Sequence, residues 1–499
     1  MRTIPSSQPT SPVSGQCSPS LPVVDLEVPA SPPGSPHLEG LKTQVLDALK
    51  SLAEYVNRSD VVTGAEEVEA LEREIVHHTD QVAGLLIGYA LQQAIESVAL
   101  QEEIRELLRV CPKRLKNQGR REVCIHPLRG EPVRISTSYF SRQGKKGGRK
   151  KSRRGTYPAL VVLGLYGHYT PGLAAELSFA ATVTSSYDEA QQLLHDRGHS
   201  LDRKTLRSVT MSYGARARAA VFAKADRMTE SLTGRRVVIA TDGGRMRIRQ
   251  KKKGPKTSKG RHRYHTTWRE PKLLIIYVVT EQGKHDRSFA PFLDGTLQGP
   301  DAVFWLLAYY LKRLQVHRAD QLLFIADGAR WIWKRVGALM RAVGCGPEQY
   351  AELIDFYHAV EHLGRIANLQ PHWTATYRKQ WLSLYRRHLL NGAIEKVLAE
   401  LRCLCWGTRT RQLKTECEYF VKNQGRMNYA RLRQQGLPIG SGAIESAVRR
   451  VVNLKLKGAS SYWLADNAET MLFLRSYLKA GRWQSLKQFA YSAEVPLIS

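Results

Sequence analysis

Acidic residues are scarce in this chain relative to basic ones. Its 499 residues include 45 Asp and Glu against 75 Lys and Arg, which gives a formal net charge of +30. An excess of this size indicates a polyanionic partner, because its field attracts dense negative charge over long distances. Nucleic acid is the first candidate, since its phosphates release counterions on binding, and an anionic membrane surface is the second.

Long apolar runs are also missing. The longest strongly apolar stretch, near residues 273–279, is far shorter than the roughly 18 residues of a membrane span. The first residues are rich in Pro and Ser, so no signal peptide is evident, and no basic amphipathic helix with a strong apolar face appears. We therefore expect a cytoplasmic protein without a membrane partner.

Cysteine is infrequent, with seven residues at irregular spacings. An odd number without a pattern is typical of a reducing compartment. Cys403, Cys405 and Cys417 match no zinc-binding spacing, and small buried residues on a helix are the favoured interpretation.

Composition and apolar periodicity divide the chain into segments. Alternating strands and helices after residue 233 predict an α/β core with a mixed sheet flanked by helices. We expect strands at 237–240, 273–279 and 322–326, and a strand at 245–250 paired with 262–268. The expected segments are a disordered Pro/Ser-rich tail (1–36), a helical region (37–110), an extended basic segment (111–155), a helical region with helix-turn-helix rhythm (156–232), the first part of the core (233–344), a helical insertion (345–435) and the last part of the core (436–499).

Three helix starts are expected from capping residues. Thr63 with Glu66 and Ser186 with Glu189 have the spacing of capping boxes, and Ser200 can cap the helix that follows.

Basic residues gather in several of these segments. Residues 142–154 hold eight Lys and Arg and no acid, which is typical of a DNA-backbone arm or of a solvated loop, and the overall charge favours the arm. Helix-turn-helix DNA binding at 186–207 is as plausible as two unrelated short helices. The residues expected to contact nucleic acid are Arg149, Lys150, Lys151, Arg153, Arg154, Arg203, Lys204, Arg207, Arg245, Arg247, Arg249, Lys251, Lys252, Lys253, Arg449, Arg450, Lys455 and Lys457.

Three carboxylates stand in positions suited to catalysis. Asp242 and Asp327 each end an apolar strand next to glycine, and Glu445 opens a helix after a glycine-rich approach. Phosphodiester chemistry with two metal ions needs a small set of carboxylates, because Mg²⁺ prefers oxygen ligands. The alternative is structural: a strand-end Asp is often a turn former, and Glu445 can pair with Arg449 on its own helix.

The segments 240–244 (ATDGG), 324–329 (FIADGA) and 439–446 (IGSGAIES) resemble the three DDE motifs of bacterial insertion-sequence transposases. The nearest group is the ISKra family, which is related in plan to Mutator-like elements. Residues 354–363 resemble the Asp-x-x-His element that such enzymes carry after the second Asp. The resemblance covers about residues 156–483.

The resemblance implies an RNase H-like core with a large helical insertion between the second Asp and the Glu. It implies Asp242, Asp327 and Glu445 as ligands of two Mg²⁺ (or Mn²⁺) ions, His358 as a catalytic group near the scissile phosphate, and Asp355 as an auxiliary residue. The expected partners are double-stranded DNA, both transposon ends and target, and further copies of the chain in a dimer or larger assembly. The location would be the bacterial nucleoid.

Relatives carry a Cys-rich, zinc-ribbon-like segment before the core, whereas Cys111 retains one cysteine of the expected pair here. We therefore expect no structural zinc. Tyr462 and Trp463 either pack in the core, which we favour, or stack on an unpaired base.

The function predicted is metal-dependent cleavage of transposon ends and strand transfer into target DNA. The alternatives are an RNase H-like nuclease without strand transfer and a non-catalytic, domesticated DNA-binding protein.

Overall fold

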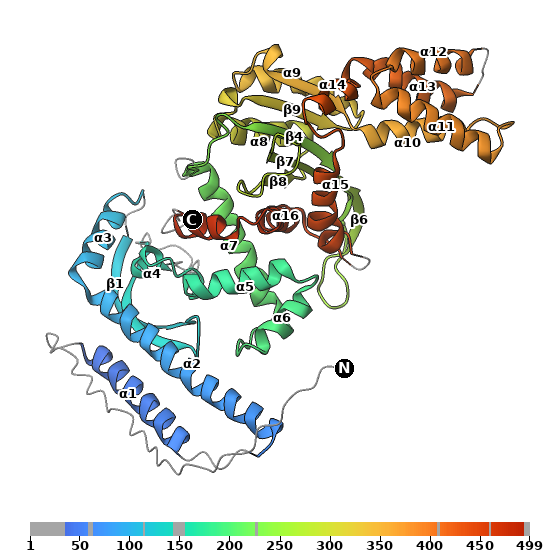
Figure 1. Ribbon diagram of the computed structural model, residues 1–499. Coiled ribbons are helices and arrows are strands. Elements are labelled where there is room, and N and C mark those ends of the chain that lie inside the picture. Colours follow the sequence, from blue (N-terminus) through green and yellow to red (C-terminus); the bar gives the residue numbers. More distant parts are fainter. Residues whose placement is uncertain are drawn as a thin grey trace, which may run out of the picture.

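The computed structural model describes residues 35–57, 63–112, 115–142, 155–224, 228–406, 410–458 and 461–493. A central α/β core carries a separate N-terminal group of helices and strands on one side and a helical projection on the other (Figure 1). Nearly all of the expected tail, and the basic residues Arg149, Lys150, Lys151, Arg153 and Arg154, lie outside the described residues.

The N-terminal group combines long helices with a small sheet. It contains α1 (Pro36–Asn57), α2 (Ala65–Glu96), α3 (Val98–Arg109), β1 (Leu115–Ile125), β2 (Val133–Arg142), β3 (Gly155–Thr156) and α4 (Pro158–Val162). Strands β1 and β2 are antiparallel, and Ile125 and Ile135 are fully buried against the helices. Of the segments expected here, 37–110 is largely helical, and the described part of 111–155 is mainly extended.

One expected cap is wrong by a residue. Helix α2 begins after Gly64, and the carboxylate of Glu67 accepts from the backbone N–H groups of Thr63 and Gly64. Glu67, one position after Glu66, is the residue that reaches the free N–H groups.

No single helix among the described residues is long and apolar enough to cross a membrane. Helices α2 and α3, with a bend of 64° between them, together have the length and apolar composition of a membrane span. Its apolar residues Ile95, Leu100 and Ile104 are buried in the cluster with β1 and β2.

The core is built on a five-stranded mixed sheet with the order β10-β9-β4-β7-β8. Strands β4, β9 and β10 are parallel, and β7 is antiparallel to β4 and β8. An α/β core with a mixed sheet, as expected from the sequence, is therefore present. The strands are β4 (Arg236–Gly243), β7 (Lys272–Val279), β8 (Phe292–Thr296), β9 (Gln321–Ala326) and β10 (Tyr350–Ile354).

Both faces of this sheet are covered, which explains why its strands are apolar at consecutive positions. Val237 and Ile239 of β4 pack with α8 (Pro300–Arg313) and α9 (Arg330–Ala342). Val238 and Ala240 belong to the opposite cluster. That cluster also contains residues of α10 (Phe356–Asn368), α15 (Gly442–Val448), η5 (Arg449–Leu456) and α16 (Ala465–Lys479).

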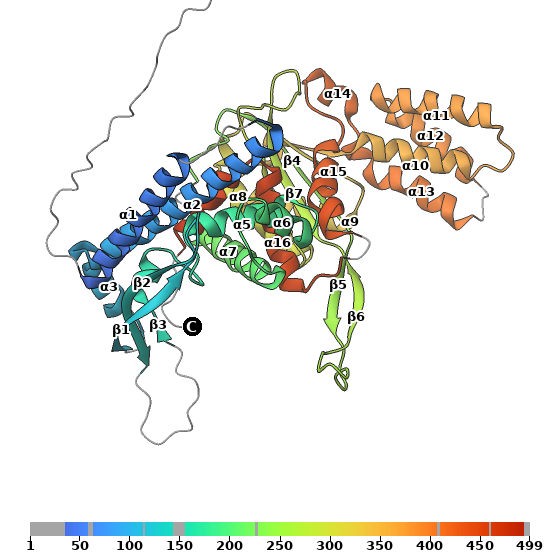
Figure 2. The same cartoon turned by 90° about the horizontal axis from the view of Figure 1, so that it is seen from below.

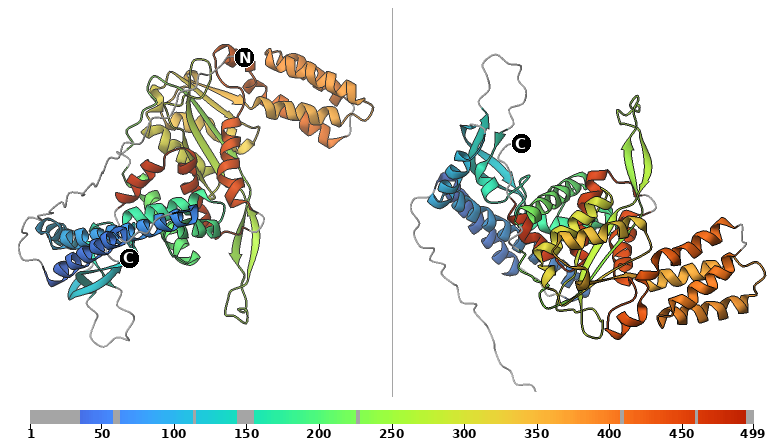
Figure 3. Two further views of the ribbon diagram at one scale, coloured as in Figure 1. Left: turned by 60° about the horizontal axis from the view of Figure 1, so that its bottom comes forward. Right: turned by 90° about the horizontal axis from the view of Figure 1, so that it is seen from above.

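The sequence interpretation of 345–435 as a helical insertion is wrong at its start. Residues 350–354 form β10, which pairs in parallel with β9 at the edge of the sheet. The strand is only five residues long, and its strand conformation comes from pairing with β9 rather than from a strong local pattern. From α10 onward the insertion is helical, and it projects from the core (Figure 3). It comprises α10, α11 (Ala375–Leu390), α12 (Ile394–Cys405), α13 (Arg411–Asn423) and α14 (Tyr429–Gln434).

Further helices connect the N-terminal group to the core. They are α5 (Pro171–Val183), α6 (Tyr187–His195), α7 (Arg203–Ala223) and α17 (Trp483–Tyr491). Arg218 of α7 forms a salt bridge of 2.5 Å with Asp294 of β8, which is fully buried and also accepts from the Tyr310 hydroxyl. This buried pair fixes α7 to the sheet.

The helix-turn-helix interpretation is confirmed only in that two helices exist. Ser186 caps α6 as expected, but Asp202, rather than Ser200, caps α7. Residues 196–202 separate the helices, more than the roughly three to four residues of a helix-turn-helix. The carboxylate of Asp202 accepts from the N–H groups of Lys204 and Thr205, so it satisfies two free donors at once.

A β-hairpin stands out from the core between β4 and β7 (Figure 2). It consists of β5 (Met246–Lys251) and β6 (Tyr264–Arg269), and its presence confirms the expected pairing. Met246 and Ile248 are buried in the core cluster, whereas Arg245 is exposed and Arg247 and Arg249 are half-buried on the other side of the strand.

Lys455, expected to contact DNA, is instead buried in η5. Its ammonium group donates to the carbonyl oxygens of Ala181 at 2.6 Å and Thr184 at 2.7 Å, and only 2% of the residue is exposed. Burial, together with the charge of Arg475, lowers the pKa of Lys455 to about 7. Lys455 therefore joins η5 to α5 and is not available to a phosphate.

Replacing Lys455 is expected to destabilise the fold. In Lys455→Met the two buried carbonyls lose their donor, which costs about 1–3 kcal/mol in the free energy of unfolding measured by urea denaturation. Lys457→Met, two residues away and exposed, is the matched control and should stay within about 0.5 kcal/mol of the parent protein. If both variants are equally stable and Lys455→Met binds DNA more weakly, Lys455 contacts DNA as the sequence predicted.

Candidate active site

Asp242 and Asp327 lie side by side at one edge of the sheet. Asp242 is the second-last residue of β4, and Asp327 directly follows β9. Because β4 and β9 are adjacent and parallel, with Ala240 opposite Ile325, both aspartates emerge at the same end. The prediction that both residues stand at strand ends is confirmed.

Backbone groups orient both carboxylates. Asp242 Oδ1 accepts from the N–H of Gly243 at 2.6 Å, and Asp327 Oδ1 accepts from the N–H of Ala329 at 3.0 Å. The Trp333 indole donates to the carbonyl oxygen of Asp327 at 2.7 Å. The strand ends are therefore fixed positions rather than mobile loops.

The glycines beside these acids allow close packing. A Cβ at Gly328 would lie 2.2 Å from the ring of Tyr419, and one at Gly440 would lie 2.6 Å from the ring of Tyr357. The approach to Glu445 was interpreted as flexible from its glycines. In the structure, Gly440 serves to let an aromatic ring lie against the backbone.

Asp355 is a buried acid of the site whose carboxylate is fixed by two backbone hydrogen bonds. It directly follows β10, is completely buried, and caps α10 by accepting from the N–H of His358 at 2.8 Å. Its second oxygen accepts from the N–H of Ser441. Since Ser441 precedes α15, this carboxylate joins the start of α10 to the start of the helix that carries Glu445.

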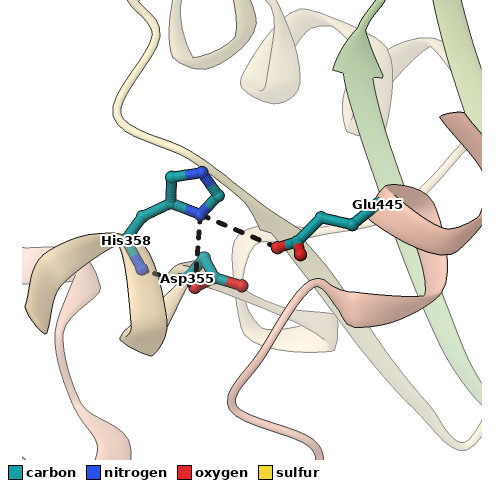
Figure 4. Close-up of side chains that lie close together, drawn as sticks. All are labelled: Asp355, His358 and Glu445. Carbon is teal, nitrogen blue, oxygen red and sulfur yellow. Dashed lines mark hydrogen bonds and ion pairs between the residues drawn. The ribbon is translucent and has the colours of Figure 1, made fainter. Parts of the chain in front are cut away.

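His358 lies between two carboxylates. Its Nδ1 is 3.4 Å from Asp355 Oδ1 and 3.9 Å from Glu445 Oε1 (Figure 4). The Asp355 carboxylate raises the pKa of His358 to about 9, against the effect of partial burial. The hydrogen bonds from His358 and Ser441 overcome burial and lower the pKa of Asp355 to about 2. At neutral pH the pair is therefore an imidazolium beside a carboxylate.

Glu445 is exposed and reaches into the same site. The Ser441 hydroxyl donates to its Oε1 at 3.1 Å, so one serine binds both Asp355 and Glu445. Sequence reasoning missed Ser441. Its position directly before a helix, four residues ahead of Glu445, was the available signal.

Negative charge accumulates at this edge of the sheet. Burial raises the pKa of Asp242, and the charges of Asp327 and Glu445 raise it further, opposed by the Gly243 N–H and by His358. Asp242 is therefore within reach of the charges of both Asp327 and Glu445. Three neighbouring carboxylates with one partly buried are stabilised by a bound cation, which fits a metal-dependent site.

Among the described residues, Asp355, His358 and Glu445 form a set whose ligand atoms all lie within 4.8 Å and which can hold a metal ion. This set shares only Glu445 with the ligands expected from the sequence. Without metal, the raised pKa of His358 favours its protonated form, and both oxygens of Asp355 accept backbone N–H groups. A metal ion bound by this set would displace the proton from His358.

The expected DNA-contacting residues divide by exposure. Arg450 is partly covered and donates to the carbonyl of Lys479, and Arg203 pairs with Asp188 at 2.8 Å. Arg247 and Arg249 are half-buried against aromatic rings of the hairpin. The exposed members of the set are Arg203, Lys204, Arg207, Arg245, Lys251, Lys252, Lys253, Arg449 and Lys457.

The cysteines follow the favoured interpretation only in part. Cys417 of α13 is buried, but Cys403 is exposed because it faces away from the helical bundle. Cys111 is half-buried and Cys124 is exposed.

The chain matches no protein-family model, no curated protein and no solved structure.

Proposed function

We propose that this protein is a DDE transposase that cleaves transposon ends and joins them to target DNA. The observation that carries the proposal is the position of Asp242 and Asp327 at the same end of two adjacent parallel strands, with Glu445 near enough for its charge to act on Asp242. The electrostatic coupling of the three carboxylates supports a shared role.

The fold agrees with the RNase H-like core that the sequence motifs imply. The sheet is mixed, with β7 antiparallel to its neighbours and helices on both faces. A group of helices is inserted between β10 and α15, so it separates Asp327 from Glu445 along the chain. These features support the proposed family resemblance to insertion-sequence transposases of the ISKra type.

The carboxylates of Asp242, Asp327 and Glu445 would hold two Mg²⁺ or Mn²⁺ ions. Such ions, when bound, stabilise the attacking and leaving oxygens of an in-line phosphoryl transfer. The protein's own contribution is positioning: backbone N–H groups fix both aspartates, and Asp355 with Ser441 fixes the start of the glutamate's helix. His358 places a positive charge beside Glu445, where it can face a phosphate oxygen.

The exposed cations supply the surface for duplex DNA. Arg449 follows Glu445 on the same helical segment, and the basic hairpin lies beyond it. Contacts of this kind neutralise phosphates and make affinity fall steeply with salt. Cleaving two ends and joining them requires two active sites, so we propose a dimer or larger assembly.

A strand-transfer assay tests the function. Purified protein, Mg²⁺ and a labelled duplex carrying the element's ends should give 3′-end cleavage and then joined products on a target plasmid. Cleavage without joining would identify a nuclease instead. Binding to the ends without cleavage, in the presence of metal, would identify a non-catalytic DNA-binding protein.

A further inference from the structure

A cavity lies outside the carboxylate site, where the hairpin meets helices α6 and α7. Its volume is about 660 Å³. Three surfaces form it: the first turns of α6 and α7, the strand β5, and residues 461–467 before and at the start of α16. Nothing in the proposed chemistry uses this cavity.

The cavity is positively charged. Arg203, Lys204, Arg207 and Arg249 line it. Its acids are already engaged, because Asp188 pairs with Arg203 and Asp202 caps α7. The four basic residues Arg203, Lys204, Arg207 and Arg249 outnumber the two acids of the lining, Asp188 and Asp202, an excess of positive charge that suits a phosphate group.

Aromatic rings extend from the cavity along the hairpin. Tyr462 is 42% exposed, and its ring centre lies 6.4 Å from that of Tyr264, which is 49% exposed. The guanidinium of Arg247 lies 4.7 Å above Tyr462, and that of Arg249 lies 4.8 Å above Tyr264. Our sequence-based preference for core packing of Tyr462 is therefore wrong: the ring is exposed where residues 461–464 run beside β5, and Trp463 is hydrogen-bonded through its backbone to Arg247 and Arg249.

Trp268 continues this series. It is 52% exposed on β6, and the guanidinium groups of Arg245 and Arg247 lie 5.4 Å and 5.6 Å from its ring centre. Exposed aromatic rings interleaved with arginine are what single-stranded nucleic acid requires, because each base can stack on a ring while its phosphate meets a cation.

We infer that this cavity and the adjoining hairpin face bind unpaired nucleotides of a DNA strand. The phosphate would meet the cations at the start of α7, and the base would stack on Tyr462. Nucleic acid is favoured over a protein partner by charge, since residues 245–263 contain ten Lys and Arg and no acid. The inference rests on the proposed function for its substrate, DNA.

The path from the active site to the cavity is short. Glu445 and Lys455 lie on one continuous helical segment, α15 with η5, and Lys455 lines the cavity. At about 1.5 Å per residue, the ten positions between them span at most roughly 15 Å, which is the axial rise of about four base pairs of duplex DNA. A nucleotide bound there would be close to the cleaved end.

Binding without metal separates this inference from catalysis. In EDTA, fluorescence anisotropy would compare a labelled twelve-nucleotide thymidine strand with an abasic strand of equal length. Tyr462→Ala should weaken binding of the thymidine strand roughly 5- to 150-fold, the equivalent of losing one stacked base, and leave the abasic strand unaffected. Tyr462→Phe keeps the ring and should bind like the parent protein.

The matched control is Tyr377→Ala, which removes a 48% exposed ring from α11 of the helical projection and should change neither affinity. Trp268→Ala gives an independent reading should Tyr462→Ala fold poorly, with the same preferential loss of the thymidine strand. Equal losses on both strands, equal effects of Ala and Phe, or dissociation of an oligomer by Tyr462→Ala would overturn the inference. Asp242→Asn should bind as the parent does, so failure of cleavage alone leaves this site intact.

Discussion

Asp242→Asn, Asp327→Asn and Glu445→Gln are each expected to bind transposon-end DNA while cleaving it about 10³-fold more slowly than the parent protein. Each substitution removes one charged oxygen ligand from a cluster whose joint charge would bind the metal ions. A metal contributes several kcal/mol to stabilising the charged transition state, and each 1.4 kcal/mol is about tenfold in rate. Single-turnover cleavage of a labelled duplex in Mg²⁺ measures the effect.

Asp320→Asn is the control for this series. Asp320 is exposed and directly precedes β9, whereas Asp327 directly follows it, so the two substitutions lie at opposite ends of one strand. Cleavage by Asp320→Asn should equal that of the parent. Retained cleavage by any of the three site variants would remove that residue from the catalytic set.

Loss of activity in Asp242→Asn should not come from unfolding. Burial and the charges of Asp327 and Glu445 raise the pKa of Asp242, so folding makes ionisation of this carboxyl group less favourable. An amide relieves this repulsion while its oxygen still accepts from Gly243. The melting temperature without divalent metal should therefore equal or exceed that of the parent.

Asp355→Ala is expected to lower the free energy of unfolding by about 3–5 kcal/mol. The substitution leaves the N–H of Ser441 without its acceptor, removes the cap of α10 and deprives His358 of its counter-ion. Because the same carboxylate joins α10 to α15, Glu445 should also lose its fixed position, and cleavage should fall in parallel. Chemical denaturation and cleavage measure the two effects.

Asp301→Ala is the control, because Asp301 is 89% exposed in the first turn of α8 and pairs with Arg335 at the surface. Its loss should cost less than about 1 kcal/mol. A cost for Asp355→Ala as small as this would show that the link between α10 and α15 has other supports.

The Asp355–His358 pair should determine how the stability of the metal-free protein depends on pH. The pKa of Asp355 is lowered from 3.8 to about 2, so its contribution is present above pH 3.8 and is lost as the pH falls toward 2. The pKa of His358 is raised from 6.5 to about 9, so its contribution is complete below pH 6.5 and is lost as the pH rises through 9.

The sequence by itself determined the local elements that carry Asp242 and Asp327. Consecutive apolar residues before each aspartate identify strands covered on both faces, and a carboxylate after such a run has only the sheet edge to occupy. Alternation of Arg with Met246 and Ile248 likewise identified β5, because side chains on a strand point to opposite sides in turn. These patterns extend over only a few residues, so they can be recognised without knowledge of the tertiary structure.

Only the tertiary structure decided which distant groups meet. The joining of Asp355 to Ser441, the burial of Lys455 under α5, and the strand β10 each depend on partners far away in the chain. Local patterns cannot distinguish a lysine that meets phosphate from one that meets two carbonyl oxygens. The difference lies in whether folding removes water from the ammonium group, and that is settled by packing across the whole core.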